Sequence, residues 1–354
     1  LSLEQFEAVV GDLKLNITGD VSESGTNTDS DILLSMVSND ISTLGQFNGR
    51  ALPALPLNIR SKITGNAKDF SFRDLSGSLG NSQVDAAVDV SLTGPKPKIT
   101  LLAQSKLIDT TQFQSTQDST ETVNKKHSDK DRLIPATDLP LPYLEKADVD
   151  INVTINELRL KKNSFSKLLL DTQVQAGALH VREFSFNAPE GTFTAELSVQ
   201  PTGNKHADVK LDISTSQMYL NLAGLPRDRF ADMPHFDIEF HVSGNGSNLQ
   251  EIAATSNGFK SLKSKGGLWE GVDLSVLDTF ILDEIFNLIM PKSKGARNTR
   301  LTCAAAFLTI ENGKAKTTPA LAITTDKITM VSSGTLDLKT EKMHFNFNAT
   351  PNNA

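Results

Sequence analysis

Several things that proteins commonly depend on are scarce in this chain. Its single cysteine, Cys303, excludes a disulfide framework and a cysteine-based structural zinc cluster. Lysine and arginine number 35 against 42 acidic residues, and the net charge of -7 argues against a general nucleic-acid binder, which needs a basic surface. No run approaches the ~20 apolar residues of a membrane-spanning helix. The chain opens at Leu1 rather than Met, so we expect a fragment or processed segment of a longer protein, which leaves a targeting or anchoring element upstream open.

Signatures of catalysis are missing as well. The six histidines are scattered, and there is no nucleophile elbow, phosphate-binding loop or HExxH motif. The nearest set is His235, Asp237, Glu239 and His241, which alternation places on one face of a strand, where they could in principle ligate a metal. The intervening apolar residues favour a simpler interpretation, in which these four lie on the solvated back of the strand. We therefore expect no enzyme, no catalytic residues, no metal and no cofactor.

The dominant pattern in the sequence has a period of two. Apolar residues alternate with polar ones in residues 84–92 and again in residues 149–155. Such alternation is typical of strands with one face in apolar surroundings and the other in water. The strands should follow one another as antiparallel meanders. The same alternation recurs in residues 193–199, 209–213, 238–242, 307–310 and 345–349.

Turn signals separate these runs. Residues 311–314 place Asn-Gly between strand-like flanks and give the best hairpin prediction, and further turns are expected at 18–20, 93–95 and 201–204. Residues 249–256 predict one short helix.

A second helix is predicted over residues 274–290, capped by Asp273 and ended by Pro291. Its apolar stripe predicts either an end cap on the sheet or a helix lying in a membrane interface. The acidic residues on this helix favour the end cap. The apolar residues concerned include Leu277, Phe280, Ile281, Ile285 and Leu288.

One segment breaks the alternation. Residues 115–131 contain a single large apolar residue, Val123, and cannot bury enough surface to offset their ordering entropy. They predict a polar linker or mobile loop between an N-terminal β segment, residues 1–114, and a C-terminal β region, residues 132–354.

Many one-sided strands have to hide one apolar face. They could pair as a sandwich, close on themselves, or curl into a trough whose interior is covered by a ligand. The inward residue types offer almost no polar group that could orient a small molecule, which suits acyl chains. The predicted fold is mainly β, an elongated and curled antiparallel sheet forming a groove, with a few short helices. The expected lining residues are Val84, Val88, Val90, Ile151, Val153, Ile155, Phe193, Leu197, Leu211, Ile238 and Phe240.

The C-terminal third resembles the AsmA family of Gram-negative envelope proteins. The resemblance is carried by Gly-Asn-Gly-Ser-Asn-Leu at 244–249, the Gly-Val-Asp-Leu end of the block at 266–274, and the blocks at 310–315 and 331–338. It implies a periplasmic protein, anchored in the inner membrane, whose curled sheet carries phospholipid toward the outer membrane. The implied partners are phospholipid acyl chains, one or both membranes and envelope proteins, without nucleic acid. The alternative is a non-enzymatic scaffold that assists outer-membrane protein assembly by pairing with client strands.

Overall fold

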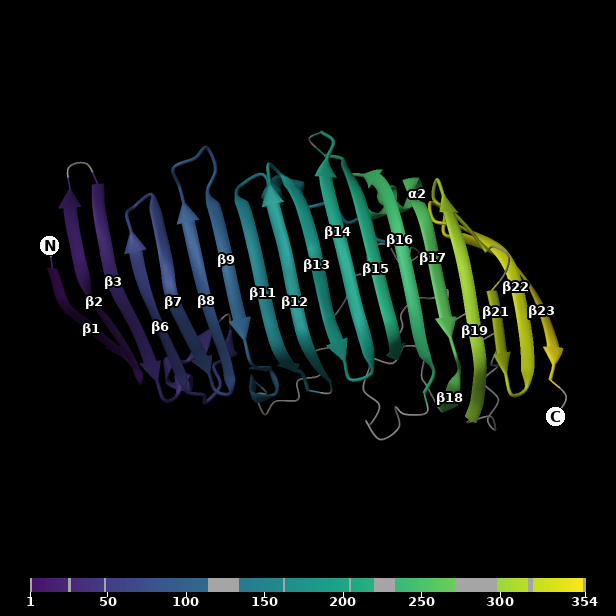
Figure 1. Ribbon diagram of the computed structural model, residues 1–354, viewed down its shortest axis with the longest axis horizontal. Coiled ribbons are helices and arrows are strands. Elements are labelled where there is room, and N and C mark those ends of the chain that lie inside the picture. Colours follow the sequence, from purple (N-terminus) through teal and green to yellow (C-terminus); the bar gives the residue numbers. More distant parts are fainter. Residues whose placement is uncertain are drawn as a thin grey trace. The chain divides into compact units, whose positions relative to one another are not determined.

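The computed structural model consists mainly of long strands (Figure 1) and divides into two compact units. Unit 1 comprises Leu1–Asn124 and Pro142–Pro189, and unit 2 comprises Lys125–Leu141 and Glu190–Ala354. Both units consist mainly of long strands, so the predicted β fold with few short helices is confirmed. The structure describes residues 2–24, 27–47, 49–113, 134–161, 163–203, 205–219, 233–270, 298–317, 321–352.

Unit 1 contains a ladder of ten long strands that follow the order of the chain. Each strand pairs with the next, and all of these pairings but one are antiparallel. A separate two-stranded hairpin, β4 (Gln46–Phe47) with β5 (Arg50–Ala51), lies outside the ladder. The ladder strands are β1 (Ser2–Val10), β2 (Leu13–Ser24), β3 (Asn27–Ser38), β6 (Leu57–Gly65), β7 (Asp69–Leu79), β8 (Ser82–Ser91), β9 (Lys98–Ser105), β11 (Asp148–Arg159), β12 (Ser164–Gln175) and β13 (Ala178–Ala188).

The exception is the pairing of β9 with β11, which is parallel. Ile99 lies opposite Val149 and Ser105 opposite Ile155, and the short strand β10 (Ile108–Asp109) also pairs with β11 in parallel. Parallel neighbours need a long connection that returns the chain to the starting end of the sheet. The expectation of uninterrupted antiparallel meanders is therefore wrong at this step. The predicted linker, residues 115–131, belongs to this connection and lies outside the described residues.

Unit 2 is built on the same principle but branches near its end. The pairings of its strands are antiparallel throughout the described residues. The long strand β19 pairs with β17 on one side and, at different points along its length, with β20 and β21 on the other. The strands are β14 (Gly191–Pro201), β15 (Ala207–Tyr219), β16 (His235–Gly246), β17 (Asn257–Ser264), β18 (Gly267–Glu270), β19 (Asn298–Glu311), β20 (Lys314–Thr317), β21 (Leu321–Thr325), β22 (Ile328–Asp337) and β23 (Lys342–Pro351).

The turns follow the local sequence, with one correction. Asn312 and Gly313 both have positive φ, 47° and 72°, as the predicted two-residue hairpin between β19 and β20 requires. The predicted turn at 93–95 lies between β8 and β9, and the one at 201–204 begins at Pro201, the last residue of β14, with residue 204 outside the described residues. The turn predicted at 18–20 is wrong, because Gly19 lies within β2, extended opposite Ile32. An isolated Gly inside an alternating run can mark a close backbone approach as well as a turn.

Helical segments are short. They are η1 (Ile41–Leu44), η2 (Thr111–Phe113), α1 (Leu141–Leu144) and α2 (Leu249–Thr255). The helix predicted over 249–256 is thus confirmed as α2, whereas the helix predicted over 274–290 lies outside the described residues. Among the helices that the structure describes, none is long and apolar enough to cross a membrane.

Candidate functional site

A single apolar face runs through the strands of unit 1. Residues directly opposite each other in a ladder share a face, and Val88 lies opposite Phe72 on β7 and Leu101 on β9. Leu101 in turn lies opposite Ile151 on β11. We call this surface the apolar face of unit 1. It includes Phe6, Leu15, Ile17, Ile32, Leu34, Met36, Ile59, Ile63, Phe70, Phe72, Leu75, Val84, Val88, Val90, Ile99, Leu101, Val149, Ile151, Val153, Ile155, Leu168, Leu170, Val174, Leu179, Val181 and Phe184.

Among the described residues, none forms a second layer over this face. None of the large apolar side chains assigned to it above is fully buried, and Phe6 keeps 48% of its surface exposed. In a two-layer domain the corresponding side chains form a closed core. Here they are shielded only in part, by their neighbours in the same sheet. A contiguous apolar surface of this extent is typical of a binding surface rather than of a bare exterior.

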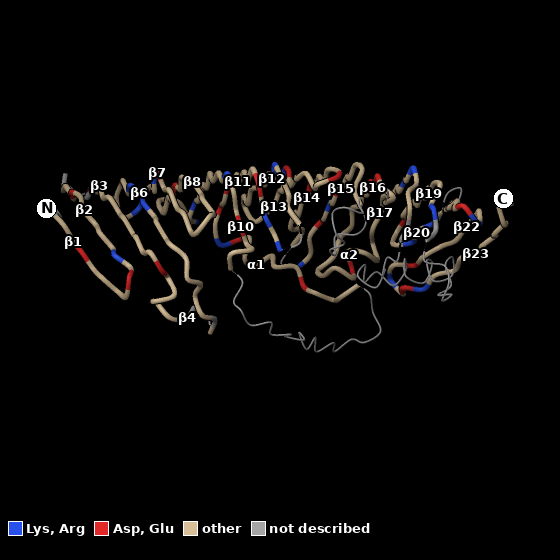
Figure 2. Tube along the Cα trace, turned by 90° about the horizontal axis from the view of Figure 1, so that it is seen from below, with Lys and Arg blue, Asp and Glu red and all other residues tan. Residues whose placement is uncertain are grey.

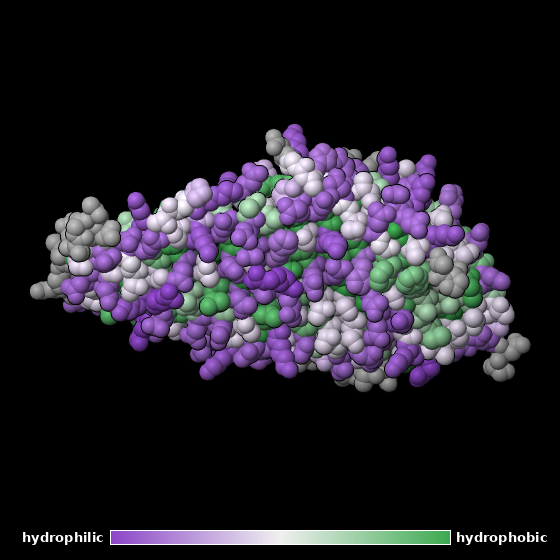
Figure 3. Space-filling view, turned by 45° about the horizontal axis from the view of Figure 1, so that its top comes forward, coloured by the Kyte–Doolittle hydropathy of each residue, from purple (hydrophilic) through white to green (hydrophobic). Residues whose placement is uncertain are grey.

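The opposite face of unit 1 is polar and held by ion pairs. Arg182 on β13 reaches Asp171 on β12 and Asp150 on β11, with its Nη2 3.0 Å from the Asp150 carboxylate. Hydrogen bonding to Asp171, then to Asp150, raises the pKa of Arg182. A second bridge joins Arg73 to Asp89 at 2.6 Å. Charges of both signs are distributed along the chain (Figure 2), and the face seen in Figure 3 is mostly hydrophilic.

Unit 2 has an equivalent apolar face, which is partly closed. Phe236, Leu301, Ala304, Ile323 and Met330 form a buried cluster across one end of it. The remaining side chains are mostly only partly buried. The face includes Phe193, Leu197, Val199, Val209, Leu211, Ile213, Phe236, Ile238, Phe240, Val242, Leu262, Ala304, Ala306, Leu308, Ile310, Ile323, Met330, Leu336, Met343, Phe345 and Phe347.

Helix α2 closes the other end of this face. Gly244 lies on the same face of β16 as Val242, which is the apolar face. A Cβ added to Gly244 would lie 2.5 Å from the Ile252 carbonyl oxygen. The helix lies to one side of the strands of unit 2 (Figure 2). Its amino end is capped by Asn248, whose side chain accepts a hydrogen bond from the Glu251 amide at 2.9 Å. Glycine in β16 thus permits the helix to pack directly on the backbone of the sheet.

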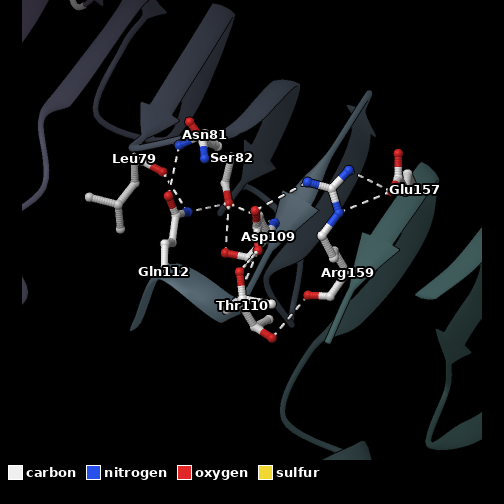
Figure 4. Close-up of polar contacts among 9 residues, drawn as sticks. Leu79, Asn81, Ser82, Asp109, Thr110, Gln112, Glu157 and Arg159 are labelled. Atoms are coloured by element: carbon white, nitrogen blue, oxygen red, sulfur yellow. Dashed lines mark hydrogen bonds and ion pairs between the residues drawn. The ribbon is translucent and has the colours of Figure 1, made fainter. Parts of the chain in front are cut away.

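A polar network fixes the point where β10 joins unit 1 (Figure 4). The Asp109 side chain is 5% exposed, accepts from the Thr111 amide at 2.9 Å and faces Arg159 at 3.4 Å. Hydrogen bonding by Thr111, chiefly from its hydroxyl, lowers the pKa of Asp109 despite the opposing effect of burial. Gln112 donates to the Ser82 hydroxyl at 2.8 Å and so ties this point to β8. The network holds the start of the parallel connection in place and has no free nucleophile and base at its centre.

Three of the four polar residues of β16, namely Asp237, Glu239 and His241, lie on the polar face, as their alternation predicts. The ring of His235 instead packs against that of Tyr219, with their centroids 4.4 Å apart, and its Nε2 is buried. Asp237 accepts from the Gln217 amide at 2.8 Å, and His241 Nδ1 lies 2.6 Å from an Asp212 oxygen. Within the described part of the chain, no three His, Cys, Asp or Glu side chains are grouped so as to hold a metal ion. The three residues on the polar face therefore serve as cross-strand partners on the surface of the sheet.

The eleven residues predicted to line a groove all lie on the two apolar faces. Six of them belong to unit 1 and five to unit 2, and each is partly buried. Whether they contact a ligand stays a prediction, as does the role of Leu277, Phe280, Ile281, Ile285 and Leu288, which are outside the described residues. The prediction missed further members of the apolar faces, notably Phe70 and Leu170. Cross-strand pairing reveals them, because bulges near these positions blur the alternation in β7 and β12.

The geometry described above can be set beside known proteins. Comparison with curated proteins and with solved structures gives no significant match. The model of the AsmA family, a family of the bacterial envelope that is generally non-enzymatic, matches residues 5–320. That match extends over the strands that make the apolar face of unit 1 and over β14 to β20 of unit 2, and it ends before β21, β22 and β23. The chain belongs to the AsmA family.

Proposed function

We propose that this protein binds the acyl chains of phospholipids along its apolar faces and carries phospholipid through the periplasm, between the inner and outer membranes. The observation that supports this most strongly is the apolar face of unit 1, over which the described residues form no second layer. Ten strands spaced ~4.8 Å apart give that face a width of roughly 45 Å. Its side chains are hydrocarbon, so removing them from water favours any ligand that brings hydrocarbon of its own.

The chemistry of the two faces suits a lipid better than a soluble substrate. A small-molecule site usually orients its ligand with a few polar groups that converge on it. The apolar face of unit 1 has aliphatic and phenyl side chains along its strands. Such side chains distinguish apolar ligands from polar ones but recognise little other detail of a ligand's structure. We therefore assign the protein no catalytic role, and membership of a generally non-enzymatic envelope family agrees with this.

A pair of matched substitutions tests the proposal. Val153→Asp places a carboxylate on the apolar face of unit 1, whereas Thr154→Asp adds the same charge to the next residue of β11, on the polar face. We expect Val153→Asp to lose most of the phospholipid that co-purifies with the protein and Thr154→Asp to keep it, as measured by lipid extraction and mass spectrometry. Leu197→Glu and Ser198→Glu form the equivalent pair in unit 2.

The outcome separates the proposal from a role as an assembly scaffold. Lipid that persists in both Val153→Asp and Leu197→Glu would contradict binding on the apolar faces, provided that circular dichroism shows both variants folded. Wild-type protein that is free of lipid and binds unfolded outer-membrane strands would instead favour the scaffold, which pairs through strand edges.

A further inference from the structure

Two neighbouring residues of strand β17, Phe259 and Lys260, lie on the faces opposite to those that their polarity predicts. Phe259 lies on the polar face of unit 2, where its ring centroid is 4.5 Å from that of His241. The next residue, Lys260, lies on the apolar face, directly opposite Phe240 on β16 and Leu308 on β19. A lysine therefore occupies a position that both neighbouring strands fill with hydrocarbon.

Among the residues that the structure describes, none offers the charge of Lys260 a counterpart. Its neighbours on the same face of β17 are Gly258 and Leu262, and Phe240 and Leu308 flank it across the sheet. It is the one charged residue that the described, paired strands of unit 2 place on this face. No described residue makes a hydrogen bond or ion pair with its ammonium. Burial lowers the pKa of Lys260, which is the expected response of an ammonium withdrawn from water.

The apolar face of unit 2 is closed on either side of Lys260. Along β16, the residue opposite Lys260 is Phe240, four residues from Phe236 in the buried cluster and four from Gly244 beneath α2. Along this face, Lys260 thus lies between the buried cluster at one end and α2 at the other.

An ammonium in hydrocarbon surroundings is costly unless it is paired. Charged groups withdrawn from water are normally met by an opposite charge, or they lose their charge. The four-carbon stem of lysine can lie along apolar side chains while its head points toward the open side of the sheet. An anionic group brought in by a bound ligand would offset the cost that the described part of the chain does not compensate.

We propose that Lys260 is the anchor for the phosphate of a bound phospholipid, so that unit 2 selects anionic phospholipids over uncharged lipids with the same acyl chains. This inference rests on the proposed function and adds a headgroup preference to it. A phospholipid matches both parts of the site, because its acyl chains meet Phe240 and Leu308 while its phosphate meets the ammonium. Free phosphate matches the ammonium alone and would have to leave water for apolar surroundings.

The experiment compares two lipids that share acyl chains. The full chain is incubated with vesicles of phosphatidylcholine that contain equal amounts of phosphatidylglycerol and diacylglycerol, and the lipids bound after separation are quantified by mass spectrometry. Wild-type protein should bind phosphatidylglycerol in preference to diacylglycerol. Lys260→Met keeps the length and apolar stem of the side chain, and we expect it to lower this ratio about tenfold while diacylglycerol remains bound.

Two further variants complete the design. Lys260→Arg keeps the charge and should keep the preference. Lys263→Met removes the same charge from the polar face of the same strand, where Lys263 lies opposite Asp237, and should also keep it. An unchanged ratio in Lys260→Met, with lipid still bound, would overturn the inference and leave the proposed function standing. Wild-type protein that binds neither lipid would overturn the proposed function and the inference with it.

Discussion

Gly244 of β16 lies directly against the backbone of Ile252 in α2, so closely that a Cβ on Gly244 would stand 2.5 Å from the Ile252 carbonyl oxygen. Because the obstacle is backbone rather than the tip of a side chain, Gly244→Ala has to displace the helix. We expect a loss of about 1–3 kcal/mol in the free energy of unfolding. Thermal unfolding should show it as a lower melting temperature.

Gly94→Ala is the control for this substitution. Gly94 lies in the loop between β8 and β9, where an added Cβ would meet the Lys96 carbonyl oxygen at 3.4 Å, an ordinary contact. The melting temperature of Gly94→Ala should stay within about a degree or two of that of wild-type protein. Equal melting temperatures for the two variants would mean that α2 does not depend on a glycine beneath it.

The Asp109 network predicts sensitivity to acid. Since the pKa of Asp109 is lowered in the folded protein, its carboxylate stabilises the fold above the ordinary aspartate pKa, and this contribution is lost as the pH falls through the lowered value. Asp109→Asn should therefore be less stable than wild type at pH 7, and the difference should shrink below about pH 4. Urea unfolding at a series of pH values measures this, with the exposed Asp85→Asn as control. A difference that stays constant with pH would rule out the carboxylate as its source.

The sequence predicts the β architecture well where alternation is unbroken. In β8 and β11 the apolar residues at every second position lie on one face, as expected. Alternation fixes a face for each strand but leaves open which strands are neighbours. The parallel step from β9 to β11 is set by a long connection that includes the polar residues 115–131, whose composition carries no signal about direction.

Strand β17 shows the limit of predicting faces from alternation. Its local pattern offers Phe259 as the natural apolar-face residue and Lys260 as the solvated one. Pairing with β16 and β19 imposes the opposite orientation, because a shift of one residue would reverse every side chain of the strand. The position of Lys260 therefore depends on two neighbouring strands and cannot be derived from β17 alone.

The ion pairs of Arg182 should contribute only a little to the free energy of unfolding. Its ion pairs with Asp150 and Asp171 lie on the exposed polar face, where solvent weakens them. We expect Arg182→Gln to lower the free energy of unfolding slightly at low ionic strength and less in 1 M salt, because screening at that concentration extends over only about 3 Å. Urea unfolding at both salt concentrations measures the effect. Arg60→Gln, on the polar face of β6 and without an ion pair among the described residues, is the control, and an equal response to salt in both variants would contradict the assignment.

Lys260 predicts a gain of stability on substitution, independent of any lipid. Because burial lowers the pKa of Lys260, its charged form disfavours the folded state, and this cost is fully present below the lowered pKa. It fades as the pH rises from that value toward the ~10.4 of an unfolded lysine. Lipid-free Lys260→Met should therefore be more stable than lipid-free wild type at pH 7, by on the order of 1 kcal/mol, and the advantage should narrow near pH 10. Lys263→Met, exposed on the opposite face, should show no such gain. A Lys260→Met variant that is less stable than wild type at pH 7 would mean that the ammonium already has a partner within the chain.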